Sequence, residues 1–265
     1  MASPDKIANS VARSANRKGR WDISKFHYNS WLEMSDKLAT SNFEEAYMIK
    51  ALTYFMNGEL VKFLEYATEL FNEVKNFNTF NIYLAAVHIN GQLENTTRLF
   101  DQYIDELSSA DNYHLLLANH FTYARYALDN ATLERNYKKF EKRLDAETRG
   151  FLLETIKLNE RDLKTLDFAG IDKALFLEVM GVAIQTLGEL GNFVTGYGIR
   201  ARRPNDDLIL SIHGQEIDIE LMHELNEAWL DKIVDHESTY DFKQISRVLV
   251  NFQPGNSEGK EEYVS

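Results

Sequence analysis

The sequence predicts a mostly α-helical protein, in which an α-solenoid of helical hairpins is followed by a small α+β C-terminal region. Three observations lead to this prediction. The 265 residues include only three prolines and thirteen glycines. So few helix-breaking residues favour long helices over a many-turned sandwich or barrel. A four-residue turn sequence recurs along the first half of the chain. Short β-type runs appear only beyond residue 193.

The first expected hairpin follows one packing helix. Apolar residues over 21–38 are spaced for a helix with one aromatic face. A second helix runs from Glu44 to a stop at Asn57-Gly58, and a third continues from Leu60. Glycine ends a helix well because it adopts the left-handed cap conformation at little steric cost. We therefore expect two helices joined at this Asn-Gly stop.

The same turn sequence returns 33 residues later. Asn57-Gly58-Glu59-Leu60 is echoed by Asn90-Gly91-Gln92-Leu93, and a weaker third copy is expected at Asn130-Ala131-Thr132-Leu133, 40 residues after the second. Self-similarity at such a period is the signature of stacked helical hairpins. The alternative is an ordinary helical bundle in which two similar stops coincide by chance.

Residues 44–144 resemble degenerate tetratricopeptide repeats. The first copy has the family's order of aromatic, small, aromatic, glycine and leucine residues: Tyr47, Ala51, Tyr54, Gly58 and Leu60. The chain departs from the family pattern because no proline ends each repeat, and Phe63 stands where a small residue is usual. A generic α-solenoid therefore fits the pattern almost as well.

The resemblance implies a groove that binds a partner protein and is lined by the first helix of each pair. The positions it implies are Leu52, Phe55, Asn81, His88, Phe121 and Arg125. On this reading the protein is an interaction module or scaffold. The identity of its partner stays open, as does formation of a homodimer.

Two further helices are expected over 148–166 and 172–190. Asp172 can cap the second of these, which is strongly apolar. A repeat array needs a cap at its open end, because each hairpin buries its apolar face mainly against its neighbours. We therefore expect the 172–190 helix to be that cap, and truncation after Leu166 to cause aggregation or a much lower Tm.

The last part of the chain predicts a small sheet. The β-type runs are 194–202, 208–212 and a weaker third candidate at 215–219, separated by turn-forming clusters. Apolar residues recur every four positions from 217 to 233, which predicts an amphipathic helix that begins inside the third run. Residues 248–252 can add another strand.

The predicted division of the chain has four parts. They are a flexible basic arm over 1–20, a helical-hairpin repeat domain over 21–168, a capping helix with the α+β region over 169–254, and a disordered tail over 255–265. Charge follows this division, since residues 1–25 hold six Lys or Arg and two Asp, whereas residues 204–265 hold four Lys or Arg and fourteen Asp or Glu.

Composition excludes several function classes. The net charge of −12 repels the phosphate backbone, so we expect no duplex nucleic acid on the body of the protein, while the basic arm is either solvated or touches an acidic partner or nucleic acid. No apolar run approaches the roughly 18 residues of a membrane span, so we expect no membrane partner. The chain has no cysteine, which excludes disulfides and thiolate zinc sites and agrees with a cytoplasmic location.

No catalytic motif is found, so we expect no enzymatic activity, no cofactor and no metal site. His223-Glu224 and His236-Glu237 begin like a zinc-protease motif but lack its second histidine. Two alternatives stay open. One is an enzyme with an unrecognised site in 194–236, around Asp206, His213 and His223. The other is an acidic inhibitor or regulator of a nucleic-acid-binding protein, suggested by the acidic segment 204–265.

Overall fold

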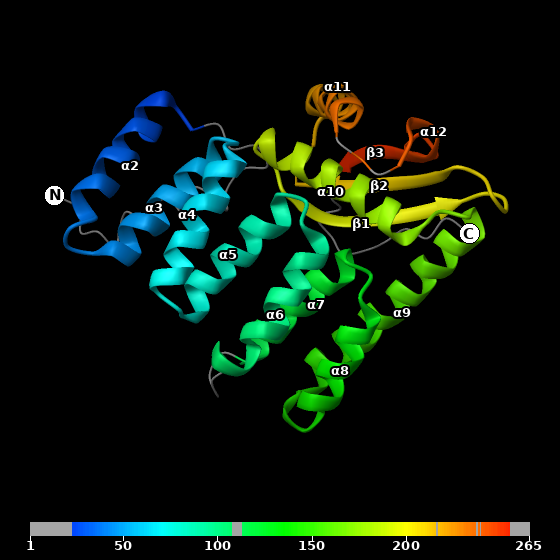
Figure 1. Ribbon diagram of the computed structural model, residues 1–265, viewed down its shortest axis with the longest axis horizontal. Helices are drawn as coiled ribbons and strands as arrows, with labels where there is room; N and C mark the ends of the chain where they lie inside the picture. The colour runs from blue at the N-terminus through cyan, green and yellow to red at the C-terminus, as the bar shows by residue number, and fades with distance from the viewer. Residues whose placement is uncertain (1–22, 108–112, 216, 237, 239, 255–265) are drawn as a thin grey trace.

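The chain folds as a run of consecutive packed helices that leads into a three-stranded sheet (Figure 1). The structure is a computed structural model that describes residues 23–107, 113–215, 217–236, 238 and 240–254. This is the expected mostly α-helical fold with a small α+β C-terminal region. The predicted basic arm over 1–20 and the predicted tail over 255–265 lie outside the described residues.

Each helix of the array packs against the next one along the chain. The helices are α2 (Lys25–Leu38), α3 (Phe43–Met56), α4 (Leu60–Glu73), α5 (Phe77–Ile89), α6 (Leu93–Leu107), α7 (Tyr113–Tyr126), α8 (Asn130–Phe140), the 3-10 turn η1 (Glu141–Arg143) and α9 (Ala146–Ala169). Five of these helices have an N-cap residue whose side chain accepts a hydrogen bond from the backbone N–H three residues later. These N-cap residues are Ser24, Asn42, Asn76, Asp129 and Asp145. Such caps satisfy N–H groups that the helix itself leaves unpaired.

Three hairpins share one turn geometry: the first is α3–α4, the second α5–α6 and the third α7–α8. The turn residue is left-handed in each, with φ of 73° at Gly58, 76° at Gly91 and 49° at Leu128. Its N–H bonds the carbonyl three residues back, and the next N–H bonds the carbonyl five residues before itself, which is the Schellman arrangement. The expected third copy, centred on Ala131, is therefore wrong by three residues, because the turn residue is Leu128.

Helix α10 (Lys173–Glu189) lies across the turns of the first two hairpins. A Cβ on Gly58 would meet the carbonyl oxygen of Glu189 at 2.3 Å, and a Cβ on Gly91 would meet that of Gly181 at 2.6 Å. Glycine is therefore required here both by its positive φ and by the close approach of the α10 backbone. Helix α10 packs on α4 and α5, whereas α9 packs on α7 and α8. The expectation that α10 caps the open end of the array stays a prediction.

The sheet has the order β1-β2-β3, with β1 (Val194–Ala201) antiparallel to β2 (Leu208–Gly214), and β2 parallel to β3 (Val248–Pro254). Helices α11 (Ile219–Asp235) and α12 (Phe242–Ile245) connect β2 to β3. The weak third strand candidate at 215–219 is wrong, because Asp218 caps α11 by accepting from the N–H of Leu221 at 2.8 Å.

One core joins the array to the C-terminal region. Tyr126 and Leu128 of the third hairpin are buried in the same apolar cluster as Phe176 of α10, Ile212 of β2 and Trp229 of α11. Burial of these side chains in one cluster therefore stabilises the packing of the array against the C-terminal region. Among the described helices, none is both long and apolar enough to span a bilayer.

Candidate functional site: a groove along the helical array

A groove with a volume of about 560 Å³ follows the first helices of the three hairpins. Helices α3, α5 and α7 supply most of its lining, and the start of β1 completes it. The lining residues are Leu52, Phe55, Phe63, Asn81, Ile82, Ala85, His88, Ile89, Asn119, Thr122, Tyr123, Tyr126, Phe193, Val194 and Thr195.

Equivalent positions of the three hairpins face this groove. The residues six positions before the left-handed turn residue are Leu52, Ala85 and Thr122, and all three line it. The positions three before the turn lie on the same helix face, one turn further on. Of these, Phe55 and His88 line the groove, while the third, Arg125, points elsewhere.

Four of the six positions implied by the resemblance lie together in the groove: Leu52, Phe55, Asn81 and His88. Phe121 does not, because its side chain is 0% exposed within the core of the second and third hairpins. Counted from Leu128, it is equivalent to the fully buried Leu84 of the second hairpin. The third hairpin instead contributes Asn119, Thr122, Tyr123 and Tyr126. Of these, counting from Leu128 would have identified Thr122, the equivalent of Leu52 and Ala85.

Two amides form a polar strip in the groove. Asn119 Nδ2 donates a hydrogen bond of 3.0 Å to Asn81 Oδ1. Within the described residues, Asn81 Nδ2 and Asn119 Oδ1 make no further hydrogen bond. One donor group and one acceptor are therefore left for a ligand, the pair that a peptide backbone unit requires.

His88 lies beside this strip and is 6% exposed. Its ring packs on Tyr123 and Tyr126, with centroid separations of 5.0 and 4.8 Å. Burial lowers the pKa of His88 to about 4, so the ring is neutral at pH 7 and keeps one donor and one acceptor nitrogen. Its Nδ1 is buried and has no hydrogen-bond partner among the described residues. Leaving a buried polar atom unpaired costs free energy, which a hydrogen bond from a water or a ligand would recover.

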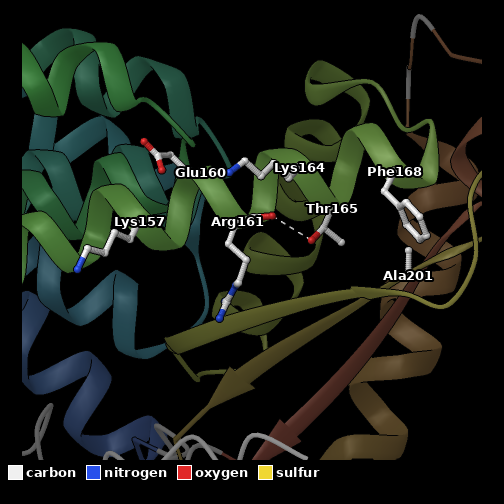
Figure 2. A pocket seen from close by; sticks show the side chains of 7 residues that line it. All are labelled: Lys157, Glu160, Arg161, Lys164, Thr165, Phe168 and Ala201. Atoms are coloured by element: carbon white, nitrogen blue, oxygen red, sulfur yellow. Dashed lines mark hydrogen bonds between the residues drawn. The ribbon is translucent and has the colours of Figure 1, made fainter. Parts of the chain in front are cut away.

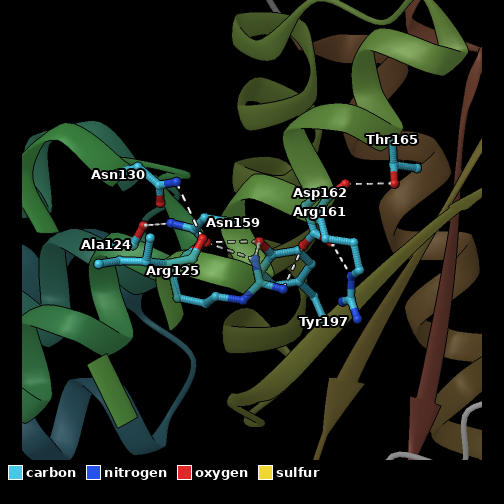
Figure 3. Close-up of polar contacts among 9 residues, drawn as sticks. Ala124, Arg125, Asn130, Asn159, Arg161, Asp162, Thr165 and Tyr197 are labelled. Atoms are coloured by element: carbon cyan, nitrogen blue, oxygen red, sulfur yellow. Dashed lines mark hydrogen bonds and ion pairs between the residues drawn. The ribbon is translucent and has the colours of Figure 1, made fainter. Parts of the chain in front are cut away.

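Arg125 ends the groove by turning toward α9 (Figure 3). Its Nη2 is 2.6 Å from Asp162 Oδ2, and its Nη1 donates to Asn159 Oδ1 at 3.0 Å. The guanidinium lies 4.3 Å from the ring centroid of Tyr197, whose hydroxyl donates to the Arg125 carbonyl at 3.0 Å. Arg125 therefore ties α7 to α9 and β1 and does not line the groove.

Comparison with protein-family models, curated proteins and solved structures finds no match. The array is compatible with helical repeats, since consecutive helices pack on their neighbours throughout. Its assignment to the tetratricopeptide family stays a prediction.

The side chains suggested for catalysis do not form one site. Asp206 lies at the β1–β2 connection, His213 on β2 and His223 on the exposed side of α11. Within the described residues, no hydrogen bond or ion pair joins these three side chains. Among the side chains that the structure describes, no three His, Asp or Glu residues gather in a way that could hold a metal ion.

Proposed function

We propose that this protein is an interaction module whose groove binds an uncharged, apolar segment of a partner protein in extended conformation. The observation that carries the proposal is the chemistry of the lining. Of the described residues that line the groove, none is Asp, Glu, Lys or Arg, although the chain carries a net charge of −12. Burying a charged ligand against such a surface would cost free energy that no opposite charge offsets.

The aromatic residues of the groove support a protein ligand. Phe55, Tyr123, Tyr126 and Phe193 offer large apolar surfaces of the type enriched in protein interfaces. Such contacts favour leucine, valine or aromatic side chains on the partner. Hydrophobic burial would therefore supply most of the affinity.

The polar groups explain why the segment would be extended. The backbone N–H and C=O groups of a helical ligand are hydrogen-bonded within the helix, so they cannot pair with the open amide groups of Asn81 and Asn119. An extended segment presents both groups to its surroundings. The neutral His88 ring adds one more partner for a backbone or hydroxyl group.

The test uses a library of random dodecapeptides displayed on phage and selected on the wild-type protein. We expect the enriched peptides to share an uncharged apolar centre, and their affinity to change little between low and high salt. Ala85→Tyr places a phenol ring in the groove and should weaken these peptides at least ten-fold, which corresponds to about 1.4 kcal/mol. Fluorescence anisotropy measures the affinities.

The matched control is Ala131→Tyr, which makes the same change at an exposed position of α8 outside the groove. Its affinity for the selected peptides should equal that of the wild type. Peptides that bind Ala85→Tyr as tightly as the control, with both variants melting alike, would refute the assignment of the groove.

A further inference from the structure

A second recess, with a volume of about 480 Å³, lies between α9 and β1 (Figure 2). It is lined by Lys157, Glu160, Arg161, Lys164, Thr165 and Phe168 of α9 and by Ala201 of β1. None of these residues lines the groove described above. We call this recess the α9–β1 cleft.

The α9–β1 cleft is positively charged in an acidic protein. Its lining holds three cations and one carboxylate. Arg161 points from α9 toward the sheet (Figure 2), and its Nε lies 3.2 Å from Asp162 Oδ1. That carboxylate also pairs with Arg125. Within the described residues, Lys157 and Lys164 make no ion pair.

The strand that borders the cleft is an edge strand. β1 pairs with β2 alone, and within the described residues its backbone makes no hydrogen bond to another backbone on its other side. Alternate residues of an edge strand direct N–H and C=O groups away from the sheet, where an additional strand can pair with them. A Cβ added at Gly196 or Gly198 would meet no atom within 4 Å, so the sheet face beside these two residues is open.

The far end of the cleft is apolar. Phe168 is 46% exposed and lies next to Ala201, the last residue of β1. Large exposed aromatic side chains of this kind favour an apolar contact. The cleft therefore offers cations along α9, open backbone groups along β1 and an apolar contact where the two meet.

We propose that the α9–β1 cleft binds an acidic, extended segment of a partner protein, which adds to the sheet as a strand beside β1. Its carboxylates would face Lys157, Arg161 and Lys164, and an apolar side chain would cover Phe168. Main-chain hydrogen bonds would supply affinity, and the charges would select acidic sequences. This proposal is independent of the groove, because different residues and the opposite ligand chemistry carry it.

The probe is a fluorescein-labelled heptapeptide of alternating Glu and Val, titrated into the full chain and followed by fluorescence anisotropy. We expect saturable binding that weakens as salt rises and that slows hydrogen exchange of the Ile199 and Ala201 amides, which point away from β2. The double variant Lys157→Glu with Lys164→Glu should weaken binding at least ten-fold. The charge-matched control, Lys138→Glu with Lys142→Glu at exposed positions of α8 and η1, should change it less than two-fold.

A second peptide has proline in place of the central valine, which removes one backbone donor and disfavours a paired strand. We expect this peptide to bind at least ten-fold more weakly. Several outcomes would overturn the proposal: no binding at millimolar peptide, equal binding of the proline peptide, or equal binding by the Lys157 and Lys164 variant. Equally tight binding of a single-stranded heptanucleotide would also overturn it, since the cleft would then attract any anion.

Discussion

The second and third hairpins carry different residues at a position that is equivalent in their first helices. Three residues before the left-handed turn residue, the second hairpin has His88, which lines the groove, and the third has Arg125, which bonds to Asp162 and Asn159 of α9. The helix face is the same in both. The difference shows that the groove ends where α9 packs against α7, and that the number of hairpins alone does not set its length.

The turns of the same two hairpins differ in a related way. Gly91 packs against the backbone of α10, whereas Leu128 holds a similar left-handed conformation with a side chain that is 2% exposed. A side chain at Gly91 would clash with α10, whereas the side chain of Leu128 forms part of the core. A left-handed conformation is costly for leucine, and burial in that core offsets the cost.

Gly91→Ala should have the largest effect on stability. The new Cβ would lie 2.6 Å from the carbonyl oxygen of Gly181 at a φ of 76°, so both overpacking and backbone strain oppose it. We expect the free energy of unfolding to fall by about 4 kcal/mol, measured by urea denaturation. The control is Gly150→Ala within α9, where a Cβ meets no atom within 4 Å, and this change should raise stability by about 1 kcal/mol. Equal effects of the two substitutions would contradict the close contact with α10.

Asp162→Asn tests the network that distinguishes the third hairpin. Its carboxylate is 0% exposed and neutralises Arg125, so the variant leaves a largely buried guanidinium without its counter-ion. We expect a loss of about 3 kcal/mol by urea denaturation. Asp101→Asn is the comparison, because Asp101 pairs with the exposed Arg135 and such pairs contribute about 1 kcal/mol at most. Similar losses for both variants would show that Asp162 has no special role.

The smallest expected effect is a change in pH dependence at the second hairpin. Burial lowers the pKa of His88 to about 4 and that of His120 to about 3, whereas an unfolded histidine has a pKa of about 6.5. Between these values the unfolded chain binds protons that the folded chain does not. Stability is therefore full above pH 6.5 and falls as the pH drops toward 4, by about 1.4 kcal/mol per pH unit for each histidine.

His88→Phe removes one of these two groups. Urea denaturation at pH 6.0, 5.5 and 5.0 should give a slope that is shallower than that of the wild type by about 1.4 kcal/mol per pH unit. Carboxylates that titrate in the same range are common to both proteins and cancel in the difference. Identical slopes would mean that His88 is accessible to protons in the folded state.

The sequence predicted the features that local signals encode. Glycine stops, helix caps and periodic apolar residues located α3 to α6, α10 and the strands β1 and β2. The resemblance to tetratricopeptide repeats implied Leu52, Phe55, Asn81 and His88, which all line the groove. The third turn was missed because Leu128 carries no glycine signal, and its left-handed conformation depends on burial by distant elements.

Tertiary contacts decided the remaining features. Val194 and Thr195 join the groove from a strand more than 60 residues beyond α7, and nothing in their local sequence indicates this. Arg125 resembles any basic residue at the end of a helix until Asp162 is placed beside it. The course of α10 across the hairpin turns likewise depends on glycines of separate helices meeting in space.

β1 belongs to both candidate surfaces. Its first residues line the groove, its last residue lines the α9–β1 cleft, and Tyr197 in its middle bonds to Arg125. Eight residues extend about 26 Å, so the two surfaces lie at opposite ends of one stiff element. If a ligand at one end shifts this strand, the affinity at the other end changes by a factor that thermodynamic reciprocity makes equal in both directions.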